Sequence, residues 1–125
     1  MKGKLFIIEG GDGSGKATQT RLLTEHLQRD GYDVKSVSYP DYDSNSSALV
    51  KMYLRGDFGS DADAVNPYAA SAFFAVDRFA SYQMKWKAFY EQGGIVIADR
   101  YTTSNMLYQM IKIDDPTQRR AYLAW

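Results

Sequence analysis

Cysteine is absent from this chain of 125 residues, and so is any excess of charge. Without cysteine the chain has neither a disulfide framework nor a cysteine metal site, which is compatible with the reducing cytoplasm. Fifteen basic residues balance fifteen acidic ones, and this balance argues against a general nucleic-acid binder. No apolar run approaches the length of a membrane span, so we expect no membrane partner.

A glycine-rich segment, Gly-Gly-Asp-Gly-Ser-Gly-Lys-Ala-Thr, lies between an apolar run at 5–8 and a helical pattern at 16–29. The order of strand, glycine loop and helix is the context of a phosphate-binding P-loop, and Lys16 stands where it reaches the β- and γ-phosphates. A glycine-rich hairpin, the alternative, does not explain a lysine at this offset. The expected ATP-phosphate ligands are Gly10, Gly11, Asp12, Gly13, Ser14, Gly15, Lys16, Ala17 and Thr18.

Ala17 departs from this motif, because the residue after the lysine is usually Ser or Thr, whose hydroxyl contacts Mg²⁺. Phosphate binding uses backbone N–H groups and does not depend on that hydroxyl. We therefore expect phosphate binding to be kept and metal coordination to be altered.

The remaining pattern alternates short strands with helices, which predicts an α/β domain with a parallel sheet. A glycine at position 31 is expected to end the first helix. Strands are predicted at 33–39 and 95–98. Helices are predicted at 48–54, from Asn66-Pro67 to about 92, at 102–113, and from Asp115-Pro116 onward.

The core face of the long helix is predicted from its apolar spacing. Ala69, Ala72, Phe73, Val76 and Ala80 recur at helical intervals and form the expected core stripe. Phe74 and Arg78 fall off that stripe, which by itself favours positions on the surface. The alternative is a planar ligand, since an aromatic ring can stack on it while a guanidinium four residues later binds its edge.

The strand at 95–98 ends in Asp99-Arg100-Tyr101. In open α/β sheets, ligands bind outside the carboxyl ends of the strands, where we expect Asp99 and the glycine loop to meet. An exposed strand-end ion pair between Asp99 and Arg100 is the alternative. In the following helix, Tyr101, Asn105 and Tyr108 share one face.

Together these motifs resemble the thymidylate kinase family over the whole chain. The resemblance rests on the glycine loop followed by Gln19, on Tyr39-Pro40, and on Tyr53-Leu54-Arg55-Gly56. It also rests on Phe74-Ala75-Val76-Asp77-Arg78 and on Asp99-Arg100-Tyr101 with Ser104-Asn105.

The resemblance implies a reaction and a role for each matching residue. The reaction is transfer of the ATP γ-phosphate to dTMP with Mg²⁺, giving dTDP and ADP. Lys16, Asp99 and Arg100 would be catalytic, and Asp99 would also bind the metal. Asp41 stands where many relatives carry an arginine, so no phosphate contact is expected from it. The implied dTMP ligands are Asp12, Tyr42, Leu54, Phe74, Arg78, Arg100, Asn105 and Tyr108.

The resemblance also implies a three-layer P-loop nucleoside monophosphate kinase fold with parallel strand order 2-3-1-4-5. Only the first three strands are predicted here, which leaves strand 1 with an apolar edge. We therefore expect residues 1–125 to form one domain that is the N-terminal part of a longer kinase, without its LID and adenine-binding segment. The resemblance further suggests a homodimer.

Two alternative functions stay open at the level of sequence. One is a kinase for another small acceptor, such as a deoxynucleoside, which comparison of dTMP with thymidine would distinguish. The other is a non-catalytic nucleotide-binding module, suggested by Ala17 and by the absence of a LID from these residues.

Overall fold

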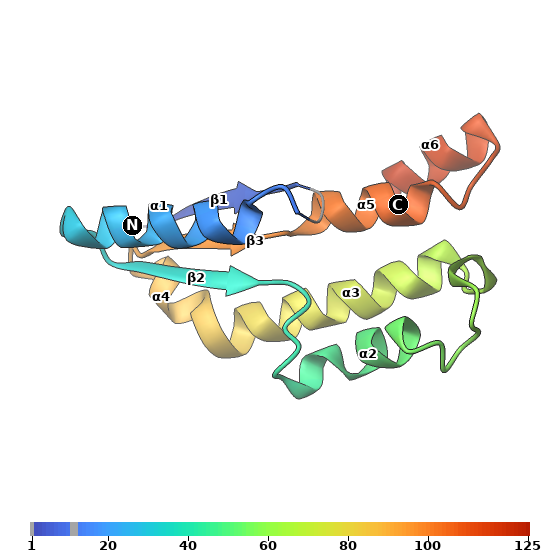
Figure 1. Cartoon of the computed structure of the whole chain (residues 1–125), viewed down its shortest axis with the longest axis horizontal. Helices are drawn as coiled ribbons and strands as arrows, with labels where there is room; N and C mark the ends of the chain where they lie inside the picture. The colour runs from blue at the N-terminus through green and yellow to red at the C-terminus, as the bar shows by residue number, and fades with distance from the viewer. Residues whose placement is uncertain (1, 11–12) are drawn as a thin grey trace.

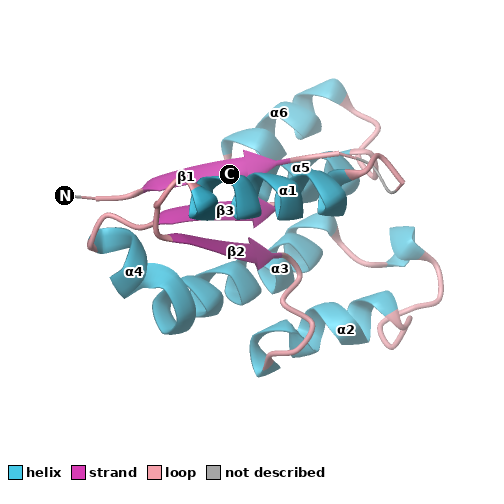
Figure 2. Ribbon diagram, turned by 60° about the vertical axis from the view of Figure 1, so that its left-hand side comes forward, coloured by secondary structure: helices cyan, strands magenta, loops and turns pink. Residues whose placement is uncertain are grey.

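The computed structural model describes residues 2–10 and 13–125. It forms an α/β domain in which helices flank a small sheet (Figures 1 and 2). None of the helices within the described ranges is both long and apolar enough to cross a bilayer.

Three parallel strands form the sheet, in the order β1-β3-β2. They are β1 (Lys4–Ile8), β2 (Val34–Ser38) and β3 (Ile95–Asp99). The central strand β3 is buried on both faces, which explains its near-continuous apolar sequence. This arrangement confirms the first three strands of the predicted order. In register, Asp99 stands level with Ile8 and Ser38, so the three strands end together.

Helix α1 (Lys16–Arg29) begins and ends where the sequence predicts. Gly15 precedes it with φ +84°, a left-handed conformation that glycine adopts without a steric penalty. At the other end the Tyr32 N–H donates to the Leu27 carbonyl and the Gly31 N–H to that of Gln28. Gly31 has φ +90°, which confirms it as the glycine that ends the helix.

The connection from β2 to β3 holds most of the remaining helices. After a 3₁₀ turn, η1 (Asn45–Ser47), come α2 (Ala48–Leu54) and a second such turn, η2 (Ala62–Ala64). The predicted long helix follows as α3 (Pro67–Ser81), a π-helical turn η3 (Tyr82–Trp86) and α4 (Lys87–Glu91). Its predicted N-cap is confirmed, because the Asn66 side chain accepts a hydrogen bond from the Tyr68 N–H.

Helix α1 and the α3–α4 helix, which connect parallel strands, lie on opposite sides of the sheet (Figure 1). Helix α5 (Thr102–Met110) continues from β3 and ends before the predicted Ile113. Helix α6 (Pro116–Ala124) follows, with Asp115 as its N-cap. Helix α3 contacts both α2 and α5, and parts of all three helices lie beyond the carboxyl ends of the strands (Figure 1).

The predicted core stripe of α3 is wrong. Ala69, Ala72 and Val76 are exposed, and Phe73 and Ala80 are only half-buried. The buried side chains are small or polar and lie roughly 120° around the helix from the predicted stripe, as their spacing shows. Their polar groups are hydrogen-bonded to other elements, a condition that apolar periodicity does not record. The buried set is Ala70, Ser71, Asp77 and Ser81.

Candidate functional site

The carboxyl end of β3 faces the glycine loop. Lys16 Nζ, at the start of α1, lies 2.9 Å from Asp99 Oδ1, and both side chains are about seven-eighths buried, with 13% and 14% exposed. This ion pair places the lysine beside the end of β3, which is level with the ends of β1 and β2.

Arg100 has a backbone conformation that is uncommon for a residue with a side chain. Its φ is +68°, in the left-handed region, which costs on the order of 1–3 kcal/mol and recurs at functional sites. The surroundings hold it there, because the Arg100 N–H donates to the Ile8 carbonyl at 3.0 Å. The next N–H, of Tyr101, donates to Glu9 Oε1 at 3.0 Å. The ends of β1 and β3 are thereby joined directly beside the glycine loop.

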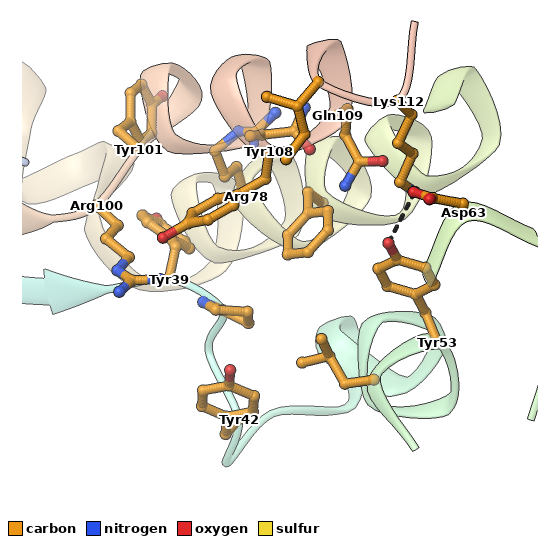
Figure 3. Close-up of a pocket in the computed structure, with 15 residues that line it drawn as sticks. Tyr39, Tyr42, Tyr53, Asp63, Arg78, Arg100, Tyr101, Tyr108, Gln109 and Lys112 are labelled. Atoms are coloured by element: carbon orange, nitrogen blue, oxygen red, sulfur yellow. Dashed lines mark hydrogen bonds between the residues drawn. The ribbon is translucent and has the colours of Figure 1, made fainter. Parts of the chain in front are cut away.

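A pocket of about 350 Å³ opens between α2, α3, α5 and the segment that follows β2 (Figure 3). Figure 3 shows Arg100, Tyr39 and Tyr42 toward one end and Tyr53, Asp63 and Lys112 toward the other. A concave, mostly apolar pocket with a few convergent polar groups is the usual form of a small-molecule site. The lining residues are Tyr39, Pro40, Tyr42, Tyr53, Leu54, Asp63, Phe74, Arg78, Arg100, Tyr101, Asn105, Tyr108, Gln109, Ile111 and Lys112.

The pocket gathers most of the residues that the sequence nominates for the acceptor. Those lining it are Tyr42, Leu54, Phe74, Arg78, Arg100, Asn105 and Tyr108. Gly11 and Asp12 lie outside the described residues. Lys16 and Asp99 do not line this pocket and lie together at the glycine loop. Two clusters therefore meet at the strand ends, with Arg100 in the pocket directly after Asp99.

Phe74 and Arg78 lie within the pocket, so the surface positions favoured by the apolar spacing are wrong for both. The Phe74 ring meets the Tyr53 ring edge-to-face, with centroids 6.3 Å apart. Burial lowers the pKa of the Arg78 guanidinium, while the neighbouring Tyr101 and Asp77 act in the opposite direction. Arginine stays charged in proteins, so Arg78 brings a half-buried positive charge to the pocket wall.

Tyr39 links the wall of the pocket to the π-helical turn. Its hydroxyl donates to Ser81 Oγ and accepts from Trp86 Nε1, each at 2.9 Å. Burial raises the pKa of this hydroxyl, which the two hydrogen bonds partly oppose. Tyr39 is therefore a neutral, fixed side chain at physiological pH.

Gln109 is a pocket residue that the sequence reasoning missed. It is only 2% exposed, and its Oε1 accepts no hydrogen bond from the described residues. The same holds for Oδ1 of Asn105, one turn earlier on α5. Buried amide oxygens without partners are rare, and a ligand that donates hydrogen bonds would satisfy them. The spacing of four residues from Asn105 is the signal that could have found Gln109.

A divalent metal could be held here by one carboxylate. No three His, Asp or Glu side chains gather as a metal site in the part of the chain that is described. Mg²⁺, however, is usually bound by one or two carboxylates together with waters and substrate phosphates. Asp99 fits that mode, because its carboxylate is largely buried beside the glycine loop, where its present partner is the Lys16 ammonium.

Comparison with known proteins identifies the family. The family model described as thymidylate kinase matches residues 8–116. The chain belongs to the thymidylate kinase family. This assignment does not favour the deoxynucleoside kinase or the non-catalytic binding module as alternatives. The matched range includes the carboxyl ends of all three strands and every residue that lines the pocket.

Curated members of the thymidylate kinase family show the same relationship. The probable thymidylate kinase of Pyrococcus horikoshii is 33% identical over 109 residues, which are 87% of this chain and 53% of that protein. The thymidylate kinase of a Synechococcus strain is 37% identical over 106 residues, which are 84% of this chain and 49% of that protein. The chain thus spans about half the length of the curated relatives it matches.

Solved thymidylate kinases also share the fold. The enzyme from Candida albicans superposes with a TM-score of 0.72 at 30% identity, covering 93% of this chain and 48% of that one. The enzyme from Ehrlichia chaffeensis gives the same TM-score, 0.72, at 26% identity, covering 97% of this chain and 63% of that one.

Proposed function

We propose that the protein transfers the γ-phosphate of ATP to dTMP, giving dTDP and ADP. The observation that carries this proposal is the pocket itself. It combines an aromatic ring, a half-buried guanidinium, a second arginine at the strand end, and two amide oxygens that have no hydrogen-bond partner among the described residues. Membership of the thymidylate kinase family supports the choice of dTMP as the ligand.

The acceptor base belongs between α2, α3 and α5. Phe74 stacks on the thymine ring, Leu54 walls the other side, and Arg78 donates to its O4 carbonyl. The Asn105 and Gln109 oxygens are available for the N3–H, the one ring donor of thymine. Tyr108 lies against the sugar, where it disfavours a 2′-hydroxyl.

The acceptor phosphate belongs at the end of the pocket where Arg100 and Tyr42 lie (Figure 3). Arg100 follows Asp99, so this end of the pocket adjoins the glycine loop. Such a position would put the acceptor oxygen next to the phosphate that is transferred, and positioning of this kind accounts for most of the catalysis in phosphoryl transfer.

The donor binds along residues 10–18, which act as a P-loop. Its phosphates accept hydrogen bonds from backbone N–H groups and draw Lys16 away from Asp99. Asp99 and the ATP phosphates would hold Mg²⁺, which neutralises charge on the transferred group. Lys16 and Arg100 provide the positive charge that comes from the chain itself.

The natural protein works in the cytoplasm as a homodimer in this proposal. Exposed apolar side chains on α3, among them Val76 at 52% and Phe79 at 65%, support an interface between two copies.

The test is an assay of ADP release by the full natural protein with ATP and Mg²⁺, offering dTMP, dCMP and thymidine in turn. We expect turnover with dTMP, much less with dCMP, and none with thymidine, which has no phosphate for Arg100. Turnover of thymidine in preference to dTMP, or no ADP release with any acceptor, would contradict the proposal.

A further inference from the structure

The segment that follows β2 contains a carboxylate, Asp41, between two residues that line the pocket. We call residues 40–46 the acceptor loop. Pro40 and Tyr42 of this loop line the pocket, and Asp41 stands between them. Figure 3 places Tyr42 at the end of the pocket occupied by Arg100. A phosphate group carries about −1.5 to −2 charges at neutral pH, so a bare carboxylate at Asp41 would repel it.

The Asp41 carboxylate is paired with a positive charge. Lys85 Nζ, from the π-helical turn η3, lies 2.5 Å from Asp41 Oδ2 and 2.6 Å from Ser44 Oγ. The Ser44 hydroxyl donates to the same Asp41 oxygen at 2.9 Å. A lysine distant in the sequence thus reaches the acceptor loop and pairs with its carboxylate.

Other contacts already hold the loop in place. Asp77 of α3, only 1% exposed, accepts hydrogen bonds from the Asp41 N–H at 2.8 Å and the Ser46 hydroxyl at 2.7 Å. The Tyr39 hydroxyl anchors the start of the loop to Ser81. Lys85, by contrast, has a half-exposed side chain, and exposed ion pairs contribute little to stability. We therefore expect the charge of Lys85 to affect ligand binding more than it affects the stability of the fold.

We propose that Lys85 is a positioning residue for the acceptor phosphate, which acts by neutralising Asp41 beside the phosphate end of the pocket. The inference rests on the proposed function, since it takes a phosphate to lie at that end. Arg78 and Arg100 line the pocket, while Asp41 lies between two lining residues and its N–H donates to Asp77. Asp41 and Lys85 line a neighbouring hollow that shares Pro40 and Tyr42 with the pocket. Lys85 balances one of these two carboxylates, so that the arginines present an excess of positive charge to the phosphate.

The experiment measures the binding of dTMP and thymidine to the full natural protein and to Lys85→Met, which removes the charge but keeps most of the stem. We expect the Kd for dTMP to rise about three- to tenfold, because a surface charge near a phosphate is partly screened by water and salt. Thymidine binding, followed by ligand-observed NMR, should change by less than about twofold, since the nucleoside carries no phosphate. The KM for dTMP should rise while kcat stays within about twofold.

Rescue separates a charge effect from a structural one. Asp41→Asn in the Lys85→Met background should restore dTMP affinity, because the repelling carboxylate is then gone. Lys85→Arg should bind dTMP as the parent does. Lys87→Met is the matched control, since Lys87 Nζ contacts only Gln83 among the described residues at 3.5 Å. It should leave both affinities unchanged.

Four outcomes would overturn the inference. Unchanged dTMP affinity in Lys85→Met would show that its charge is not used. Equal losses for dTMP and thymidine, or failure of Asp41→Asn to restore binding, would assign Lys85 a structural role only. A parent protein that binds no dTMP would refute the proposed function and this inference with it. If Lys85→Met did not fold, the Asp41→Asn single variant would decide, since it should bind dTMP at least as tightly as the parent.

Discussion

At the scale of single residues, Arg78 is the half-buried charge that faces the base in the proposed complex. Replacing it by alanine should weaken dTMP binding by about 1–3 kcal/mol, the range for a hydrogen bond to a charged group that leaves its partner unpaired. Calorimetry with dTMP measures this change, and ATP binding should be nearly unaffected. Arg29→Ala, at the exposed end of α1, is the control. Unchanged dTMP affinity in Arg78→Ala would remove Arg78 from the site.

Replacing Lys16 should have the opposite effect to replacing Arg78: the donor side is affected and dTMP binding is kept. It lies on Asp99 at the glycine loop and does not line the acceptor pocket. Lys16→Ala should therefore abolish ADP release while the Kd for dTMP stays within about twofold, because in the proposed function the lysine binds the donor phosphates. The exposed strand residue Lys4 offers the control variant Lys4→Ala. Comparable turnover in Lys16→Ala and the parent would refute the P-loop assignment.

At the scale of elements, Asp77 is the residue that attaches the acceptor loop to α3. Replacing it by alanine leaves the Asp41 N–H and the Ser46 hydroxyl without their acceptor. The free energy of unfolding should fall by about 2–4 kcal/mol, since hydrogen bonds to charged groups contribute about 1.5–3 kcal/mol each and their losses overlap. Denaturant titration measures the change.

Ser46→Ala is the comparison for that experiment, because it removes only one of the two hydrogen bonds to Asp77. Its loss of stability should be clearly smaller than that of Asp77→Ala. A loss as large as that of Asp77→Ala would show that the backbone N–H of Asp41 gains nothing from the carboxylate.

The same helix shows how far elements can be predicted from sequence. The bounds of α1 and α2 agree with the prediction, because capping glycines and apolar spacing act within a few residues. The buried face of α3 was predicted wrongly, because Asp77 is buried through hydrogen bonds from the distant acceptor loop and Ser81 through one from Tyr39. The π-helical turn η3 was not predicted, and its Lys85 and Trp86 also act across the chain.

At the scale of the whole molecule, β1 forms one edge of the described sheet. Phe6 and Ile7 on this strand are 44% and 43% exposed, and an exposed apolar edge strand promotes pairing between chains. We expect the 125-residue chain to associate as its concentration rises, which light scattering and size-exclusion chromatography would detect. Ile7→Lys should suppress this association, because a charge on an edge strand opposes pairing.

Phe79→Lys serves as the counterpart to Ile7→Lys. Phe79 lies on α3 and is 65% exposed, away from the sheet edge. It should leave edge association unchanged and act only on an interface formed by α3. Association that is abolished by Phe79→Lys and untouched by Ile7→Lys would contradict the edge-strand explanation.

Sequence by itself determined the parts of this protein that depend on neighbours along the chain. These are the strand, glycine loop and helix around Lys16, the bounds of α2, the N-cap of α3, and the motifs that identify the family. Tertiary structure alone decided the buried face of α3, the place of Gln109 in the pocket, and which distant groups meet, such as Lys16 with Asp99 and Lys85 with Asp41. The physical reason is that burial of polar and charged groups is set by partners in other elements, and local spacing carries no record of those partners.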